Sequence, residues 1–314
     1  MCNRGGHVTR VAAIDCGTNS IRLLVTDLDA GSSAQHDQVR DVQIVRLGQG
    51  VDRTGRLDAD AVARTLAVCA DYARTCRELD VEAIRFCATS AARDADNAAD
   101  FREAVRGLLG VEVEVLPGDE EAALAYDGVV RVAGDLATPI IVADVGGGST
   151  ELILGDAAQV RIARSLDIGS VRMTERHLRT DPPTASEVAD ATADIDRAID
   201  SSGIDVGAAA TIVGVAGTCT NLAAYALGLE EYERDRIHLA TFDRDDIVAS
   251  CVKLLHSSVE RRRAVPFMHP GRADVIGGGA LIVERLLAPV ETTVPFVVSE
   301  HDILDGIAWS ASPS

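Results

Sequence analysis

The feature that most constrains the fold of this chain is a repeated pattern of apolar run, acidic glycine turn and apolar run. The first copy spans residues 11–27 and the second spans residues 139–154. An apolar run on each side of a polar glycine turn predicts a β-hairpin. In each copy an aspartate, Asp15 or Asp144, follows the first run and lies two positions before a glycine. Because an internal repeat sets the architecture of a chain, we expect a duplicated fold in which these aspartates are equivalent.

The segments between and beyond the two copies predict the alternating helices and strands of an α/β fold. Apolar residues at helical spacing predict helices at 57–79, 101–109, 119–132, 186–199, 243–255, 273–287 and 301–309. Short apolar or alternating runs predict further strands at 43–47, 83–88, 111–116, 211–216 and 294–298. The sequence has no long linker, so the boundary falls just before the second copy. This predicts domains of residues 1–127 and 128–301, with the C-terminal segment 302–314 able to pack back on the first.

The charge of the chain limits how it can hold a polyanion. Its 49 acidic residues outnumber its 30 basic residues and give a formal net charge of −19. A chain of this charge does not coat nucleic acid or an anionic membrane, so we expect neither as a partner. Lys253 is the one lysine, and the sequence contains no G-x-x-x-x-G-K-[ST] loop. A phosphate-rich ligand therefore has to be bound by backbone amides, a metal ion or a local basic patch.

The sequence also indicates a cytoplasmic protein. Residues 1–10 lack the apolar segment of a signal peptide, and no run approaches the ~18 apolar residues of a membrane span. The seven cysteines are odd in number and form no C-x-x-C pair, which is typical of scattered, reduced thiols. We expect these cysteines to fill the core.

The two glycine turns are candidate phosphate sites. Glycine lets the backbone approach an anion closely and adopt positive φ, and successive amides can form a nest for the anion. An aspartate at the same place can hold Mg²⁺ against the phosphate. One such turn could be an ordinary hairpin, but two turns with an aspartate at the same place favour phosphate binding. The candidate residues of the turns are Gly17, Thr18, Asn19, Ser20, Gly146, Gly147, Gly148, Ser149 and Thr150.

Three consecutive acids, Asp119, Glu120 and Glu121, open a predicted helix. The helix dipole favours acids at this end, which is a sufficient structural explanation for them. Alternatively, one of them is the general base that deprotonates water during hydrolysis of a phosphoanhydride. Helical periodicity does not indicate which of the three carboxylates faces a site.

Two other junctions could bind phosphate. Arg93 follows a strand and two hydroxyl residues, and its guanidinium could grip a phosphate bidentately. An N-cap hydroxyl beside a solvated arginine explains the same pattern. Gly217 and Thr218 lie between a strand and a helix, where free helix amides can bind phosphate. The basic runs at 161–179 and 261–272 are either a track for a polyanion or solvated faces with local ion pairs.

Together these motifs resemble the Ppx/GppA phosphatase family of the actin-like, sugar-kinase and Hsp70 ATPase superfamily. The matching segments are 14–20 (IDCGTNS), 88–93 (ATSAAR), 118–122 (GDEEA), 144–152 (DVGGGSTEL), 217–218 (GT) and 299–306 (SEHDILDG). They occur in the family's order along nearly the whole chain. The sequence ends after the two-domain core, so it is similar to the short form of the family, without added C-terminal helical domains.

The resemblance implies two RNase-H-like α/β domains, as in actin-like ATPases, with the active site in the cleft between them. It implies that Glu121 is the general base that activates water. It also implies that Asp144 and Glu151 act in catalysis and bind a metal ion, and that Asp15 binds the metal from the first domain. The implied metal is Mg²⁺, or Mn²⁺ in its place. Water would attack the terminal phosphoryl group in line.

The same resemblance implies that Arg93, Gly217 and Thr218 help the two turns to hold phosphate. A homodimer is also expected from the resemblance alone.

The expected function is that of an exopolyphosphatase, which removes the terminal phosphate of inorganic polyphosphate, with short chains as the expected substrate, and releases orthophosphate. The alternative within the family is a guanosine pentaphosphate 5′-phosphohydrolase. The acids at 120 and 121, and the lack of a recognisable adenosine motif, weigh against a kinase of the same superfamily. The complete set of acids weighs against a non-catalytic phosphate or nucleotide sensor.

Overall fold

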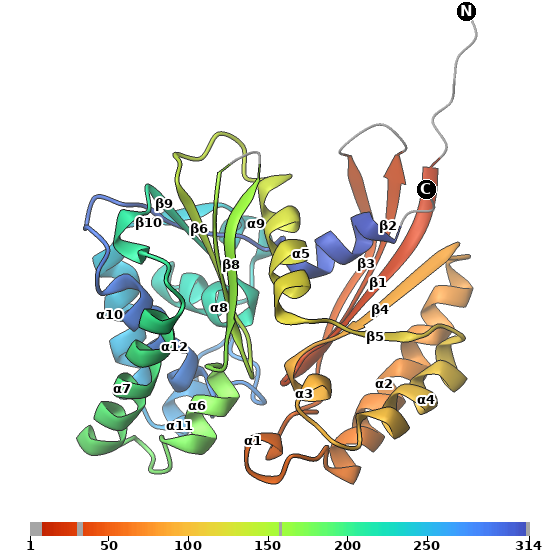
Figure 1. The fold of residues 1–314 in the computed structure, drawn as a ribbon, viewed down its shortest axis with the longest axis horizontal. Coiled ribbons are helices and arrows are strands. Elements are labelled where there is room, and N and C mark those ends of the chain that lie inside the picture. Colours follow the sequence, from red (N-terminus) through yellow and green to blue (C-terminus); the bar gives the residue numbers. More distant parts are fainter. Residues whose placement is uncertain (1–7, 30–33, 157–158, 312–314) are drawn as a thin grey trace, which may run out of the picture. The chain divides into compact units, whose positions relative to one another are not determined.

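The structure, a computed structural model, describes residues 8–29, 34–156 and 159–311. Most of the segment considered for a signal peptide, including Cys2, and the last residues of the segment 302–314 lie outside the described residues. The chain forms two compact units: unit 1 (Met1–Pro117 with Ile303–Ser314) and unit 2 (Gly118–Asp302) (Figure 1). The boundary expected at 127/128 falls within a helix of unit 2, because that helix packs on the second sheet.

Unit 1 is a mixed sheet with helices. The strand order is β3-β2-β1-β4-β5, and β1 is antiparallel to β2 and parallel to β4. The strands are β1 (Val8–Cys16), β2 (Ser20–Asp29), β3 (Gln35–Ile44), β4 (Ala83–Ala88) and β5 (Val113–Val115). The helices are α1 (Val51–Thr54), α2 (Ala59–Glu78), α3 (Ser90–Arg93), α4 (Ala98–Leu109) and α13 (Ile303–Ser310). Side chains of α2 and α4 share one core with the sheet, whereas α13 contacts β1, β2 and β4.

Unit 2 is a larger mixed sheet in the order β10-β11-β9-β6-β7-β8. The strands are β6 (Ile140–Val145), β7 (Thr150–Gly155), β8 (Val160–Leu166), β9 (Thr211–Val215), β10 (Ala240–Phe242) and β11 (Phe296–Val298). The helices are α5 (Gly118–Val130), α6 (Ser170–Arg176), α7 (Ala185–Ser201), α8 (Ala216–Ala226), α9 (Arg234–Ile237), α10 (Arg244–Leu255), α11 (Val259–Arg263) and α12 (Ile276–Leu287).

The topology confirms the repeat in the sequence. Without the edge strand β10, the second sheet has the strand order of the first, with β8, β7, β6, β9 and β11 in the places of β3, β2, β1, β4 and β5. In both sheets the first three strands form an antiparallel meander, and the other two run parallel to the first strand. The two sheets therefore share one topology, and the predicted mixed α/β fold with two sheets is confirmed.

The two faces of the second sheet are covered by different helices. Val142 and Ile153 pack with α5 in one cluster, whereas Val145 packs with α7, α8, α10 and α12 in a larger core. Because side chains alternate along a strand, Asp144 and Glu151 lie on the face covered by α5. The helix that begins unit 2 therefore covers the acids of the second glycine turn.

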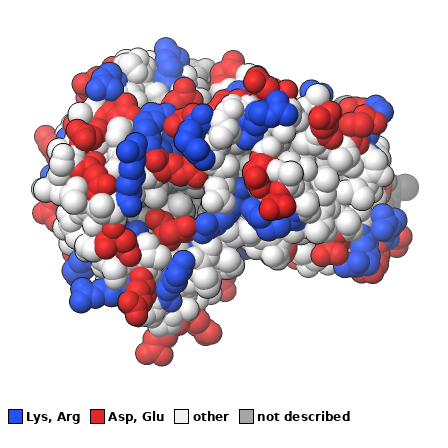
Figure 2. All heavy atoms as spheres, turned by 90° about the horizontal axis from the view of Figure 1, so that it is seen from below, with Lys and Arg blue, Asp and Glu red and all other residues white. Residues whose placement is uncertain are grey.

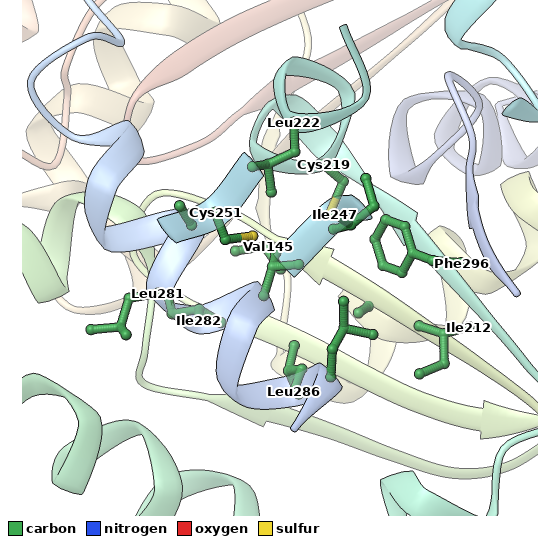
Figure 3. Close-up of a cluster of buried hydrophobic side chains, with 14 of the residues drawn as sticks. Val145, Ile212, Cys219, Leu222, Ile247, Cys251, Leu281, Ile282, Leu286 and Phe296 are labelled. Carbon is green, nitrogen blue, oxygen red and sulfur yellow. The ribbon is translucent and has the colours of Figure 1, made fainter. Parts of the chain in front are cut away.

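The larger core contains two of the cysteines. Figure 3 shows Cys219 of α8 and Cys251 of α10 among buried hydrophobic side chains. Burial raises the pKa of both thiols. The six described cysteines are all buried and free, which confirms for these six the prediction that they fill the core. As a separate finding, no helix within the described ranges is long and apolar enough to span a membrane.

The sequence prediction missed several short elements and was also incomplete in two regions beside the glycine turns. The strand expected at 43–47 is β3, which ends at Ile44 and is paired along most of its length with β2. The elements β8 and α6 were not predicted. β8 is an edge strand that carries Arg161 and Arg164, so it has no apolar run, and α6 is only seven residues long.

Candidate active site

Three polar side chains form a row across the sheet of unit 2. Asp144 on β6 is the register partner of Glu151 on β7, and Glu151 is the partner of Ser165 on β8. Register partners project from the same face of a sheet. The hydroxyl of Ser165 donates a hydrogen bond to Oε1 of Glu151 at 2.7 Å. Both acids are buried, with 6% of Asp144 and 1% of Glu151 exposed.

Helix α5 adds the third carboxylate to this row. Asp119 and Glu120 in its first turn are exposed, whereas Glu121 is buried and acts electrostatically on Glu151. The fold thus selects one of the three acids that the sequence left open. Gly118 allows the helix to start close to the sheet, because a Cβ at this position would lie 2.3 Å from the Cβ of Ser165.

The pKa of Glu151 is raised well above its ordinary value. Burial is the largest cause, followed by the negative charges of Glu121 and Asp144. Hydrogen bonds from Ser165 and Ser149 act in the opposite direction and lower it. Buried acids that perturb one another in this way are characteristic of sites that move protons or bind a cation.

The second glycine turn is joined to the start of α6 through its carbonyl groups. The carbonyl oxygens of Gly146, Gly147 and Gly148 all accept hydrogen bonds from this helix. The donors are the N–H groups of Ser170, Val171 and Arg172, at 2.8–3.2 Å, and Nε of Arg172, at 2.6 Å. The carbonyls of the turn therefore face α6.

The amides of the same turn face the opposite way. The peptide bonds of the turn are trans, and a trans peptide directs its C=O and its N–H to opposite sides. The N–H groups of Gly147, Gly148 and Ser149 therefore point away from α6. Three successive amides of this kind form a nest that can hold an anion. The nest is next to the acids, because Ser149 is hydrogen-bonded to Glu151.

Positive φ does not explain the glycines of the two turns. In the described chain, Gly17, Gly146, Gly147, Gly148 and Gly217 are not among the residues with positive φ, so that part of the sequence argument was wrong. The segment before α6 lies directly against the second turn, and this contact requires glycine at position 169. A Cβ on Gly169 would lie 2.4 Å from the carbonyl oxygen of Gly147.

The first glycine turn repeats the backbone of the second. The N–H of Gly17 donates to the carbonyl of Ser20 at 2.9 Å, just as the N–H of Gly146 donates to the carbonyl of Ser149 at 3.1 Å. The segment after the third strand closes over the turn here too, since the N–H of Gly48 donates to the carbonyl of Thr18 at 2.9 Å.

The two turns differ in charge. Asp15 has Arg22 as its register partner, in the place that Glu151 occupies beside Asp144. Nη2 of Arg22 lies 2.7 Å from Oδ2 of Asp15, and both side chains are largely buried. Asp15 is therefore held in an ion pair within unit 1, whereas Asp144 lies beside a second acid in unit 2.

The other predicted phosphate ligands of unit 1 lie near the first turn. Thr18 and Asn19 are buried, and the hydroxyl of Thr18 is 2.8 Å from that of Ser90, at the junction after β4. Arg93, at the end of α3, donates from Nη1 to the carbonyl of Leu116 at 2.8 Å.

The other predicted ligands of unit 2 are partly used within the fold. Thr150 is fully buried, and its hydroxyl donates to the carbonyl of Ile168 at 2.7 Å. Gly217 and Thr218 lie in the first turn of α8. The guanidinium of Arg272 covers Gly217, because a Cβ there would lie 2.5–2.8 Å from its Nη2, Cζ and Nη1 atoms.

Much of the two basic runs is used in local contacts. Arg161 pairs with Asp156, and Arg176 pairs with Asp194. Arg262 is only 4% exposed and donates to backbone carbonyls at the end of α10. Figure 2 shows acidic and basic side chains intermixed on the face that it displays. These contacts fit the local ion pairs that the sequence left as one explanation of the runs.

The chemistry of the acids fits a magnesium site of few protein ligands. Within the described ranges, no three His, Cys, Asp or Glu side chains are grouped so that they could hold one metal ion. Mg²⁺ is commonly bound by one or two carboxylates together with substrate phosphates and water. Asp144 and Glu151, as adjacent buried acids that repel each other, could serve as such a pair of oxygen ligands.

The sequence prediction missed residues that support the second turn. Ser165, Gly169 and Arg172 contact Glu151 or the turn, and Gly278 of α12 packs against Ser170, since a Cβ on it would lie 2.7 Å from the carbonyl oxygen of that residue. The available signal was the segment 165–172 (SLDIGSVR), which follows the second hairpin just as residues 45–48 follow the first.

The comparisons with known proteins agree with this arrangement. The sequence profile of the Ppx/GppA phosphatase family matches residues 24–310. Exopolyphosphatase 2 of Mycobacterium tuberculosis is 45% identical over 315 residues, which cover 96% of this chain and 98% of that protein. The crystal structure of an exopolyphosphatase-like protein is 42% identical, with a TM-score of 0.92, and the match covers 96% of this chain and 97% of that one.

A further relative carries a different name. The guanosine-5′-triphosphate,3′-diphosphate pyrophosphatase of Vibrio cholerae is 35% identical over 175 residues, which cover 56% of this chain and 35% of that protein. The profile match, however, extends over most of the chain. With its duplicated sheets, its two glycine turns and this match, the chain belongs to the Ppx/GppA phosphatase family.

Proposed function

We propose that this protein is an exopolyphosphatase, which hydrolyses the terminal phosphoanhydride of inorganic polyphosphate and releases orthophosphate. Short chains are the proposed substrates. The observation that carries the proposal is the amide nest at 147–149 next to the buried acids of unit 2. The nest supplies donors for a terminal phosphate without any lysine, and the acids supply a base for water. The name of the Mycobacterium tuberculosis relative supports polyphosphate as the substrate.

Glu121 is the proposed general base. It is buried on the face of the sheet that carries Asp144 and Glu151, and it is the member of its acidic run that acts on Glu151. A base in this position can take a proton from water as the water attacks phosphorus. Amides aimed at the phosphate oxygens can stabilise the charge that develops there, because they are already oriented by the fold.

Mg²⁺, or Mn²⁺ in its place, is the proposed metal, and Asp144 and Glu151 are its proposed ligands in unit 2. When bound, such an ion neutralises charge on the transferred phosphoryl group. Asp15 remains a proposed ligand from unit 1, where its present partner is Arg22. Arg93, Gly217 and Thr218 remain proposed contacts to phosphate.

The test is orthophosphate release from tripolyphosphate, long polyphosphate, guanosine pentaphosphate and ATP, each with Mg²⁺, with Mn²⁺ and with chelator. The proposal predicts the highest kcat/KM for tripolyphosphate, and loss of activity in the chelator. Glu121→Gln should abolish release while tripolyphosphate still binds. The exposed neighbour gives a matched control, Glu120→Gln, which should keep most of the activity. Full activity of Glu121→Gln would remove this residue from the role of base.

The second candidate function is 5′-phosphate removal from guanosine pentaphosphate. The match to the Vibrio cholerae enzyme favours it, and the same nest and acids could serve that substrate. A kcat/KM for guanosine pentaphosphate well above that for tripolyphosphate would make this the better assignment.

We also propose a cytoplasmic homodimer. The dimer is supported by the family resemblance, and the cytoplasmic location by the buried, free state of the six described cysteines. Sedimentation velocity of the purified protein tests the dimer, and fractionation of cells tests the location.

A further inference from the structure

We propose that Arg172 is a positioning residue for phosphate binding, which holds the second glycine turn in the shape that aims its three amides at one phosphate. This inference rests on the proposed function of the same site. Arg172 belongs to the basic run at 161–179, for which the sequence suggested a polyanion track. Its contacts indicate a different task from that of a surface charge.

Arg172 donates two hydrogen bonds to carbonyl groups of the second glycine turn. Its main-chain N–H donates to the carbonyl of Gly147 at 3.2 Å, and its Nε donates to the carbonyl of Gly148 at 2.6 Å. The side chain is only 12% exposed. A hydrogen bond from a guanidinium is shorter and stronger than one between neutral groups, so this contact fixes the Gly148–Ser149 peptide firmly.

The hydrogen bond from Arg172 also affects the N–H group at the other end of the same peptide. A cation on the carbonyl of Gly148 polarises the peptide that it shares with the N–H of Ser149. Hydrogen bonds in such a chain strengthen one another, so this N–H becomes a better donor to an anion. Arg172 can therefore support phosphate binding without touching the phosphate.

The surroundings leave the turn few other positions. Gly169 and Gly278 allow backbone contacts so close that a Cβ on either would lie 2.4 and 2.7 Å, respectively, from a carbonyl oxygen. The start of α6 is thereby packed between the turn and α12. In this packing the side chain of Arg172 holds the carbonyl of Gly148, whereas α6 main-chain amides hold the carbonyls of Gly146 and Gly147.

The same run provides a matched control. Arg164 on β8 has the same charge, but it is exposed, and its Nη1 donates to the carbonyl of the adjacent Ala163. Arg172→Met and Arg164→Met each remove one positive charge and keep an aliphatic side chain. A role for charge alone predicts the same effect in both variants, whereas the positioning role predicts an effect in the first only.

The experiment measures kcat and KM for tripolyphosphate at low and high salt, together with hydrogen exchange of the amides at 170–172. For Arg172→Met we expect KM to rise about tenfold to a hundredfold, the range that loss of one charged hydrogen bond produces, with kcat changed far less. We expect faster exchange of the three amides, since their acceptors lie in the turn. Arg164→Met should match the wild type. The KM of Arg172→Lys should lie between those of the wild type and Arg172→Met, because an ammonium can donate to the carbonyl but lacks the fork of the guanidinium.

Three results would overturn the proposal: an unchanged KM in Arg172→Met, equal effects in Arg172→Met and Arg164→Met that vanish at high salt, or no recovery in Arg172→Lys. If Arg172→Met does not fold, the proposal is tested by comparing the KM of Arg172→Lys with that of the wild type, and an unchanged KM would overturn it. A wild-type protein that neither binds nor hydrolyses tripolyphosphate would overturn the proposed function and the phosphate role of Arg172 together. Hydrogen exchange would then show separately whether Arg172 holds the turn.

Discussion

Replacing Glu151 by glutamine should make the protein more stable while it removes activity. Glu151 is 1% exposed, and its pKa is raised by burial and by the charges of Glu121 and Asp144. Glutamine keeps the shape and the acceptor for the hydroxyl of Ser165 but removes the charge. The variant therefore exchanges a proposed metal ligand for a neutral group that the fold tolerates better.

The size of the gain follows from the register of the sheet. Asp144 and Glu151 are register partners, whose Cβ atoms lie about 5 Å apart in an antiparallel pair. Two charges about 6 Å apart at an effective dielectric constant of about 20 repel each other by about 3 kcal/mol. Allowing for imperfect hydrogen bonding of the new amide, we expect a gain of about 2 kcal/mol. For a unit the size of Gly118–Asp302, that raises Tm by about 4–8 °C.

The gain should depend on pH in a defined direction. With a raised pKa, Glu151 in the folded state holds a proton that the unfolded state has already lost. Stability of the wild type therefore falls as pH rises from the ordinary glutamate pKa of about 4.3 to the raised value. Glu151→Gln does not lose stability in this way. The difference in the free energy of unfolding between the two proteins should therefore vanish below about pH 4 and grow toward pH 8.

The assay is thermal and urea unfolding of both proteins in chelator, at several pH values from 4 to 8, with Glu120→Gln as the exposed control. The chelator matters because a bound cation would neutralise the same acids. A variant no more stable than the wild type at pH 8, or a gain of equal size at pH 4, would refute the account of Glu151 as a repelled, buried acid.

The other predictions concern packing, a buried charge and the metal. Gly169→Ala should lower the free energy of unfolding by about 1–3 kcal/mol and abolish most phosphate release, because its Cβ would meet the carbonyl of Gly147. As a control, Gly107→Ala in α4, where a Cβ would meet open space, should raise the free energy of unfolding by about 0.5–1 kcal/mol. Arg40→Met should destabilise unit 1 by about 3–5 kcal/mol in urea unfolding, since Asp305 is fully buried and loses its guanidinium partner. Adding Asp305→Asn to that variant should recover part of the loss, and its failure to do so would contradict the charge argument. Chelator should abolish phosphate release and Mg²⁺ should restore it; activity that persists in chelator would exclude the proposed metal.

The sequence predicted the repeated hairpins well because their signal is local. Apolar runs and a polar glycine turn determine a hairpin within about twenty residues, and β1, β2, β6 and β7 lie where this pattern indicated. It predicted β8 and α6 poorly because neither has a strong local pattern: β8 is an edge strand with arginines, and α6 is short. The contacts that hold the second turn come from this poorly predicted region.

The difference among the three acids at the start of α5 shows the same limit. Asp119, Glu120 and Glu121 are equivalent as a charged first turn, and only the packing of α5 on the sheet buries the last of them beside Glu151. The partner of each turn aspartate is likewise set by strand register, which gives Asp15 an arginine and Asp144 a glutamate.

By itself, the sequence determined the duplication, the two glycine turns and the family, because each of these produces a pattern within short runs of consecutive residues. The tertiary structure decided which carboxylate is buried, which aspartate keeps a positive partner, and to which side of the second turn the amides point. These depend on strand register, on the packing of α5 and on the hydrogen bonds from α6. Such contacts join residues that are far apart in the chain, so no local pattern in the sequence contains them.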